Sequence, residues 1–353
     1  MSILYVIIST MLIKLYNIIL IVTKGGEDMK PNILCVGFAK CGTTTLYDIM
    51  KQHPDIYLSG IKEPIYYGMK ELVEKKGFEW YENRYYSKRN NKKVIMEINP
   101  ILGRNVSASQ IKADYGNNVK IIFLIRNPID RLYSDFKMNL LDGTCFSNLS
   151  DNLGNSTKQL FDKWIKNNFI FENNYPILKE SSSTFFCESG NYYDKIKDYT
   201  ETFGKDNIKI IFFEDFIKNP KKECLKIFDF INVKSEEFIN YNLHSNDGNR
   251  LPRNLFTIKA NKIWFSKIYR PILIEKIPFI SDNMCKFLNF LTWKIPVLFS
   301  KKNLNVERMS DESRKILEKY YYNMISNLSD FINLDLFEKW HIKINGNKMI
   351  ILK

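Results

Sequence analysis

Short apolar runs alternate with polar and amphipathic stretches along most of the chain. The runs cover residues 33–36, 94–98, 119–125 and 208–213, and a glycine, polar or charged residue follows each one. A helical pattern at residues 192–203 precedes the last run. Runs of this length predict buried strands, and strands that alternate with helical patterns predict βαβ units. We therefore expect an α/β fold whose central parallel sheet is flanked by helices in three layers.

Polar side chains stand at or just beyond the ends of these runs. Lys40, Glu97, Arg126 and Glu214 belong to four different runs in this way. Ligands of parallel α/β sheets bind beyond the carboxyl ends of the strands. The pattern therefore predicts that these side chains converge on one ligand site.

The first of these ends carries a loop with glycines at positions 37 and 42. Lys40 and the threonines at positions 43–45 lie in it, and Leu46, Ile49 and Met50 begin an amphipathic stretch after it. A strand, such a loop and a helix together aim backbone N–H groups at a phosphate. The glycine spacing is that of the P-loop, but Thr43 stands where the P-loop has its lysine.

The residues at the end of the third run argue against a site that binds a nucleotide together with Mg²⁺. An NTPase usually places an acidic magnesium ligand after a later strand, and this run ends in Arg126 instead. The two basic positions favour a phosphate ligand that is bound without catalytic Mg²⁺, so we expect no metal.

Two segments resemble the PAPS-dependent sulfotransferases, and more closely their carbohydrate and heparan-sulfate branch. Residues 38–46 resemble the 5′-phosphosulfate loop of that family, and residues 125–135 resemble its 3′-phosphate motif. That motif pairs an arginine at a strand end with a serine eight residues later, and Arg126 and Ser134 match the pair. Shorter matches at 53–54, 62–67, 190–193, 213–216 and 251–254 extend the resemblance over roughly residues 31–340. It implies a P-loop-like fold and PAPS as the sulfate donor.

The resemblance also implies roles for individual residues. Lys40 would stabilise the bridging oxygen of the leaving phosphate, and Glu63 would be the catalytic base. Residues 97–100 contain no histidine, the base of the cytosolic small-molecule enzymes, and this favours a glycan or glycolipid acceptor. The implied donor-binding residues are Lys40, Cys41, Gly42, Thr43, Thr44, Thr45, Arg126, Ser134, Tyr193, Arg250 and Arg253.

Several of these assignments have a structural alternative. Glu63 is also a candidate for a surface pair with Lys62, Tyr193 for a core tyrosine, and Arg131 for a helix-surface ion pair with Asp135. Related sequences often carry a lysine and a Ser/Thr before the proline of the 97–100 motif, where this chain has Ile98 and Asn99. Among the three histidines, His53 lies in a turn where a structural role is the better interpretation.

Composition limits the partners and the compartment. The chain has 353 residues, and its apolar content of 45% excludes a disordered protein. Its net charge of +13 favours anionic partners. No zinc-finger spacing or RNP-like motif supports a nucleic-acid partner. The six cysteines are scattered, as in a cytosolic enzyme with reduced thiols, and nothing indicates an oligomeric state.

The remaining segments leave alternatives open. Residues 1–30 hold an apolar stretch at 3–22 that is a membrane anchor, an interfacial helix or an extension before a start at Met29; Lys24 and Lys30 would keep the following domain cytoplasmic. Residues 31–340 form the expected sulfotransferase domain, and 341–353 form a tail. Within the domain, residues 140–185 are expected to be a loop-rich insertion over the site or simply a variable surface region, and 310–340 a packing helix.

Residues 259–302 are both basic and aromatic. Such a segment suits an anionic membrane surface or an acidic acceptor, and equally an ordinary helical subdomain. For the whole chain, a P-loop kinase-like enzyme and a non-catalytic, membrane-attached nucleotide-binding protein remain the alternatives to a sulfotransferase.

Overall fold

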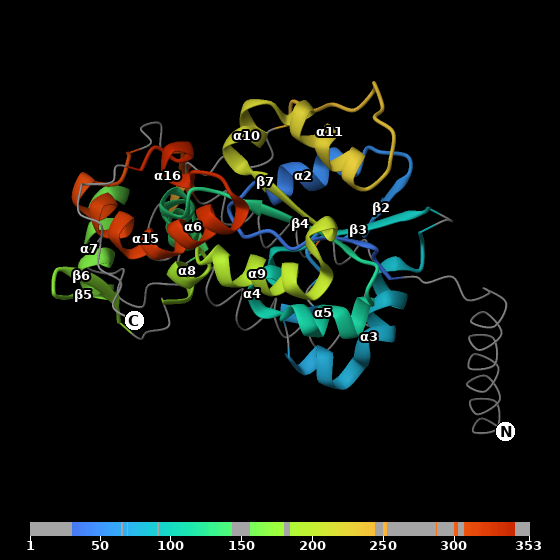
Figure 1. Cartoon of the computed structure of the whole chain (residues 1–353), viewed down its shortest axis with the longest axis horizontal. Coiled ribbons are helices and arrows are strands. Elements are labelled where there is room, and N and C mark those ends of the chain that lie inside the picture. Colours follow the sequence, from blue (N-terminus) through green and yellow to red (C-terminus); the bar gives the residue numbers. More distant parts are fainter. Residues whose placement is uncertain are drawn as a thin grey trace.

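A computed structural model describes residues 30–64, 66–68, 70–89, 92–142, 156–179, 184–243, 250–252, 287, 300–302 and 307–342. Its centre is a five-stranded parallel sheet (Figure 1). The strands lie in the order β2 (Ile56–Leu58), β3 (Val94–Ile98), β1 (Ile33–Cys35), β4 (Lys120–Ile125) and β7 (Ile208–Phe212). All four predicted runs are strands, and the fifth strand, β2, was not predicted.

Strand β1 lies in the middle of the sheet. Ile33 pairs with Met96 of β3 on one side and with Lys120 of β4 on the other. The side chains of β1 and β3 are buried on both faces of the sheet. This explains why these strands are continuous apolar runs without alternation.

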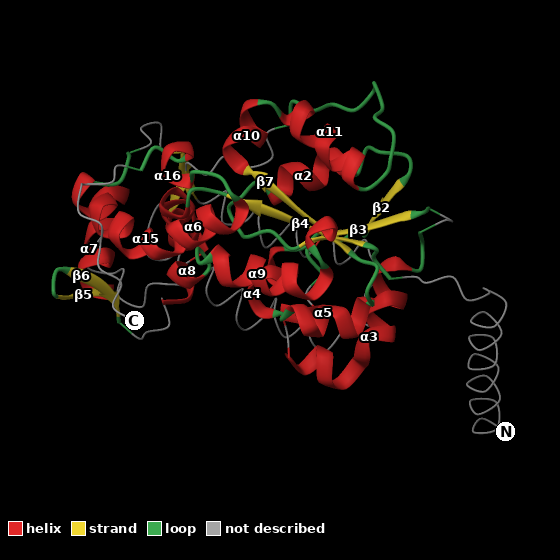
Figure 2. Cartoon of the chain, in the orientation of Figure 1, coloured by secondary structure: helices red, strands yellow, loops and turns green. Residues whose placement is uncertain are grey.

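Helices cover both faces of the sheet, as Figures 1 and 2 show. One face carries α2 (Thr43–Met50), α10 (Phe213–Lys218) and α11 (Pro220–Phe230), and the other carries α4 (Pro100–Asn105), α5 (Ala108–Tyr115) and α9 (Tyr192–Phe203). Helix α3 (Lys70–Tyr86) packs beside the 3₁₀ turn η1 (Tyr66–Gly68). The three-layer α/β architecture is confirmed.

A second group of elements lies beyond the carboxyl ends of β4 and β7 (Figure 1). It consists of α6 (Pro128–Asp142), α7 (Thr157–Asn168), the hairpin β5 (Phe169–Glu172) and β6 (Tyr175–Leu178), α8 (Thr184–Glu188), α15 (Asp311–Ile332) and α16 (Leu336–Lys339). The expectation of a loop-rich insertion at 140–185 is therefore wrong for residues 156–178. A capping box between Ser156 and Gln159 starts α7, and Phe161 and Trp164 bury its inner face.

The expected packing helix at 310–340 is two helices. Asn333 takes a left-handed conformation, with φ 54°, and ends α15. Asp335 then caps α16 by accepting a hydrogen bond from the backbone N–H of Glu338 at 3.0 Å. The pattern of Leu317, Tyr321 and Leu328 correctly predicted the buried face of α15.

Three parts of the expected organisation fall outside the described residues. These are the apolar stretch at 3–22, the tail from residue 343 onward, and residues 259–302 except Phe287 and 300–302. Strand β9 (Ser300–Lys302) pairs with β8 (Arg250–Pro252) in a separate two-stranded sheet. Within the described ranges no helix has both the length and the apolar character needed to span a membrane.

Candidate functional site

The loop between β1 and α2, residues 37–45, is called the phosphate loop below. Gly42 caps α2 in a left-handed conformation, with φ 89° and no side-chain cap. A Cβ atom at Gly42 would lie 3.1 Å from the ring of Phe213, so the position favours glycine both by conformation and by space. The backbone N–H groups of the first turn of α2 therefore remain open toward a ligand. Thr43 is buried there, and Thr44 and Thr45 are half-buried.

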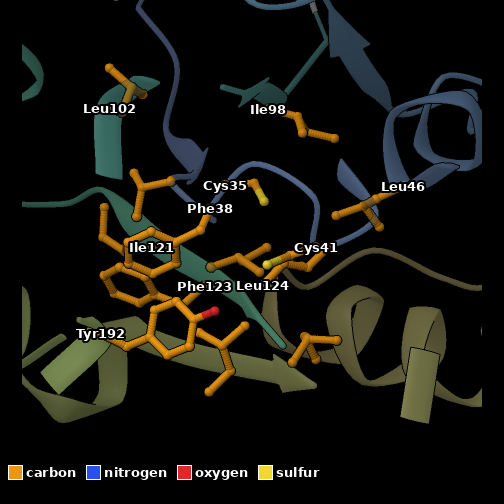
Figure 3. Packing of buried hydrophobic residues seen from close by; sticks show 14 of the residues in the cluster. Cys35, Phe38, Cys41, Leu46, Ile98, Leu102, Ile121, Phe123, Leu124 and Tyr192 are labelled. Carbon is orange, nitrogen blue, oxygen red and sulfur yellow. The ribbon is translucent and has the colours of Figure 1, made fainter. Parts of the chain in front are cut away.

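Apolar side chains of the phosphate loop itself pack into the core beside Tyr192. Figure 3 shows Phe38, Cys41 and Tyr192 gathered there, and the rings of Phe38 and Tyr192 have centroids 4.6 Å apart. Cys41 is fully buried, and burial raises the pKa of its thiol to about 12. The Cys41 side chain is thus part of the core, and only its backbone can contribute to anion binding.

Lys40 crosses from the phosphate loop to helix α6. Its Nζ lies 3.6 Å from Sδ of Met138. Its backbone is left-handed, with φ 70°, which costs a lysine of the order of 1–3 kcal/mol. Glu63, with φ 55°, shares this conformation, whereas the other described non-glycine residues with positive φ are asparagines and His341. Both residues predicted to act in catalysis therefore have strained backbones.

Arg126 joins the two phosphate motifs. Its NH1 donates a hydrogen bond to the backbone oxygen of Lys40 at 3.1 Å, although the two residues are 86 positions apart. The guanidinium lies over the ring of Phe213, 4.4 Å from the centroid. Tyr192 in turn donates from its hydroxyl to the backbone oxygen of Arg126 at 2.9 Å. The arginine is held between the phosphate loop and the start of α10.

Ser134 lies on the face of α6 that turns to the phosphate loop. It is half-buried and precedes Met138 by four residues, so the two share one side of the helix. Met138 contacts Lys40, and Arg126 bonds to the backbone of Lys40, so Ser134 stands one helical turn from a residue that contacts this pair. Strand β8, which begins at Arg250, lies against α6, and Arg253 falls outside the described residues.

Glu63 occupies a turn beside the end of β1. Its carboxylate pairs with Lys62, as the structural alternative expected, and its side chain stays 31% exposed. The turn is nevertheless joined to the end of β1, because the Asn99 side chain donates to the backbone oxygen of Pro64 while the Asn99 backbone N–H donates to the backbone oxygen of Cys35. The charge of Glu63 also acts on Arg104 at the end of α4.

Asn99 ties this turn to the sheet. Its side-chain amide donates to the backbone oxygen of Pro64 at 2.9 Å and to Oε1 of Glu97 at 3.0 Å. Its side-chain oxygen accepts from the backbone N–H of Ile101 and so caps α4. Asn99, one of the two departures from related sequences, thus positions the Glu63–Pro64 turn.

Glu97 lies in a closed group of hydroxyls that we call the tyrosine cage. Its Oε2 accepts hydrogen bonds from Tyr81, from Tyr86 at 3.0 Å and from Tyr115 at 3.0 Å. Glu97 is 1% exposed, and burial raises the pKa of its carboxyl. This enclosure excludes direct contact between Glu97 and a ligand.

Some predicted side chains lie elsewhere. The ring of Tyr193 packs against Phe331 of α15, and it is the neighbouring Tyr192 that reaches the phosphate loop. Arg131 does pair with Asp135, at 3.0 Å, but the expected surface location is wrong because both side chains are buried. His53 is structural, since its Nε2 lies 2.6 Å from the backbone oxygen of Lys234 and its Nδ1 accepts from the N–H of Asp55.

Three residues of the site were not predicted. Tyr192 and Phe213 hold Arg126, and a search for aromatic residues near the strand ends would have suggested them. Lys137 follows Ser134 by one helical turn, and the charges of Arg126 and Lys40 both act on it. Its spacing of three residues from Ser134 was the available signal. Among the described residues, no three His, Cys, Asp or Glu side chains lie close enough together to hold a metal ion.

Comparison with known proteins gives a consistent family. A family model described as "Sulfotransferase domain" matches residues 30–247. Human carbohydrate sulfotransferase 15 is 23% identical over 246 residues, which cover 58% of this chain and 44% of that protein. The membrane-associated sulfotransferase kil1 of Dictyostelium discoideum is 30% identical over 112 residues, which cover 31% of this chain and 23% of that protein. The chain thus matches less than half the length of these relatives.

A solved structure shares the fold. The crystal structure of a sulfotransferase from Alicyclobacillus acidocaldarius superposes with a TM-score of 0.53 at 19% identity. The match covers 88% of this chain and 99% of that one. At this identity the match bears on the fold alone, and it agrees with the α/β architecture described above.

Proposed function

Because the chain belongs to the sulfotransferase domain family, we propose that it transfers a sulfuryl group from PAPS to a hydroxyl or amine of a glycan or glycolipid. The observation that carries the donor assignment is the hydrogen bond from Arg126 to the backbone of Lys40. It joins a loop suited to a 5′-phosphosulfate to an arginine suited to a 3′-phosphate. A donor that carries a phosphosulfate at C5′ and a phosphate at C3′ of one ribose would contact both, and PAPS is such a donor.

The donor binds through three kinds of group. Open backbone N–H groups of the phosphate loop and the hydroxyls of Thr44 and Thr45 bind the 5′-phosphosulfate. Arg126 offers a fork of N–H donors to the 3′-phosphate, and the hydroxyl of Ser134 adds another donor. The stack of Arg126 on Phe213 fixes the plane of that fork before the ligand arrives.

In the reaction the acceptor oxygen or nitrogen bonds to sulfur, and the bond from sulfur to the 5′-phosphate oxygen breaks. Glu63 takes the proton of the acceptor, so that the acceptor leaves as a sulfate ester or sulfamate. Lys40 stabilises the negative charge that develops on the departing phosphate oxygen, and PAP leaves with the bonding electrons. As in phosphoryl transfer, positioning and charge stabilisation provide most of the rate.

The acceptor is a glycan or glycolipid. The human relative is a carbohydrate sulfotransferase, and the net charge of +13 suits an acidic polymer. We place the domain in the cytoplasm, with the apolar stretch at 3–22 as a means of membrane attachment.

The test is sulfate transfer from labelled PAPS to a panel of cell-envelope polysaccharides, glycolipids and phenols. We expect transfer to at least one carbohydrate and a loss of about tenfold to hundredfold in Arg126→Ala, because one charge-assisted contact with phosphate is removed. The exposed Arg308 provides the matched control, and Arg308→Ala should act like the wild type. Transfer of phosphate from ATP with Mg²⁺, and none from PAPS, would overturn the proposal in favour of a kinase-like enzyme.

A further inference from the structure

Helix α6 carries a cation near the site, Lys137, in addition to the predicted pair of Arg126 and Ser134. Lys137 stands three residues after Ser134 and one before Met138, whose sulfur contacts Lys40. Residues three apart on a helix share a face, and lysine side chains on a helix lean toward its N-terminus. The ammonium of Lys137 should therefore lie near Ser134.

The contacts of Lys137 agree with this direction. Its Nζ lies 5.1 Å from the centroid of the Tyr133 ring, which belongs to the preceding turn. Tyr133 is itself fixed, because its hydroxyl donates to the backbone oxygen of Glu307 at 2.9 Å. Lys137 is half-buried against this ring and does not extend freely into solvent.

The charges around Lys137 are mainly of its own sign. Burial lowers the pKa of Lys137, and the positive charges of Arg126 and, more weakly, Lys40 lower it further. The opposing carboxylate is Asp130, which is already paired with Arg314 at 2.6 Å. Three cations that repel one another in one place are best explained by an anion that binds among them.

We propose that Lys137 is a third ligand of the donor's 3′-phosphate, together with Arg126 and Ser134. The inference rests on the proposed function, since it assigns Lys137 to the same donor. Arg126 is preferred over Lys40 as its partner because Ser134, which the 3′-phosphate motif pairs with Arg126, precedes Lys137 by three residues on α6. Lys137 is then a specificity residue, because it distinguishes nucleotides that carry a 3′-phosphate from those that do not.

The experiment compares PAP with 5′-AMP by calorimetry on the full chain. For Lys137→Met we expect PAP affinity to fall by about tenfold to hundredfold, while AMP affinity changes by less than about threefold. Lys137→Arg keeps the charge and should retain PAP affinity within about tenfold. The exposed Lys112 of α5 provides the matched control, and Lys112→Met should bind both nucleotides like the wild type.

A second readout separates a binding role from a purely structural one. Without ligand, Lys137→Met removes a charge that its neighbours repel, so it should melt at or above the temperature of the wild type. Unchanged PAP affinity in Lys137→Met, an equal loss for AMP and PAP, or a lower melting temperature without ligand would each overturn the proposal. If the wild type itself fails to bind PAP, the proposed function fails instead.

Discussion

Two neighbouring regions at the carboxyl edge of the sheet handle charge in opposite ways. The phosphate loop, with Arg126 and α6, gathers Lys40, Arg126 and Lys137 around open backbone N–H groups. The tyrosine cage, at the end of the adjacent strand β3, buries the carboxylate of Glu97 among hydroxyls that satisfy it. A ligand can neutralise the charge of the first region, whereas the charged group of the second region is enclosed and cannot contact a ligand.

The difference shows how the edge of one sheet separates binding from support. A buried carboxylate that accepts several hydrogen bonds rigidifies its surroundings and has little reason to exchange them. Asn99 transmits that rigidity to the turn of Glu63 through the backbone oxygen of Pro64. Glu63 thus lies where the two regions meet, with a fixed backbone and a partly exposed carboxylate.

The largest effect is expected from Glu63, the proposed base. Glu63→Gln keeps the size of the side chain and removes its ability to take a proton. We expect sulfate transfer to fall by about 10²- to 10⁴-fold while PAP affinity stays within about twofold. Transfer rates from labelled PAPS and calorimetry with PAP measure the two quantities.

The control for this change is Glu79→Gln on the exposed face of α3. It should transfer sulfate at the wild-type rate. Transfer at the wild-type rate in Glu63→Gln as well would show that Glu63 only pairs with Lys62.

The next effect concerns Lys40. Lys40→Met retains the contact with α6 but loses the positive charge near the leaving oxygen, and we expect kcat to fall by about 10²- to 10³-fold. The exposed Lys51, just after α2, supplies the control Lys51→Met. A change confined to the KM for PAPS would mean that Lys40 binds the donor equally in ground and transition states.

The smallest effect tests the tyrosine cage through its pH dependence. Because burial raises the pKa of Glu97, the folded protein keeps this proton to a higher pH than the unfolded chain does. The resulting stability is fully present below the ordinary pKa of 4.5 and is lost as the pH rises through the raised folded value. Glu97→Gln carries no such proton and should lack this loss.

Urea unfolding at a series of pH values above 4.5 measures this pH dependence of the free energy of unfolding. The free energy of unfolding of the wild type should fall relative to Glu97→Gln, by at most about 1.4 kcal/mol per pH unit. The exposed Glu237 gives the control, and Glu237→Gln should follow the wild type. Parallel profiles for the wild type and Glu97→Gln would contradict the raised pKa.

The sequence predicted the parts of the fold that depend on continuous apolar runs. Strands β1, β3, β4 and β7 are such runs, whereas β2, at the sheet edge, stands between Asp55 and Ser59 and fully buries only Ile56, so its apolar pattern is weak. Helix α7 was missed because the polar residues around it hid the spacing of Phe161 and Trp164. The capping box at Ser156 was the signal that could have located it.

The site divides in the same way. Lys40, Arg126 and Ser134 come from local motifs; the structure joins Lys40 to Arg126, and Ser134 precedes Met138, which contacts Lys40, by one helical turn. The tyrosine cage could not be predicted, because Tyr81, Tyr86 and Tyr115 meet at Glu97 only after α3 and α5 pack beside β3. That Tyr192 contacts the phosphate loop, and not the predicted Tyr193, likewise depends on how α9 is rotated against α15.

The most direct test of the account is the affinity of the wild-type chain for PAP, 5′-AMP and ATP with Mg²⁺, measured by calorimetry under one set of conditions. The joined phosphate motifs predict that PAP binds at least about tenfold more tightly than AMP, because only PAP reaches Arg126 and Ser134 with a second phosphate. They also predict that Mg²⁺ does not strengthen nucleotide binding. Equal affinity for PAP and AMP, or a preference for ATP with Mg²⁺, would contradict the account.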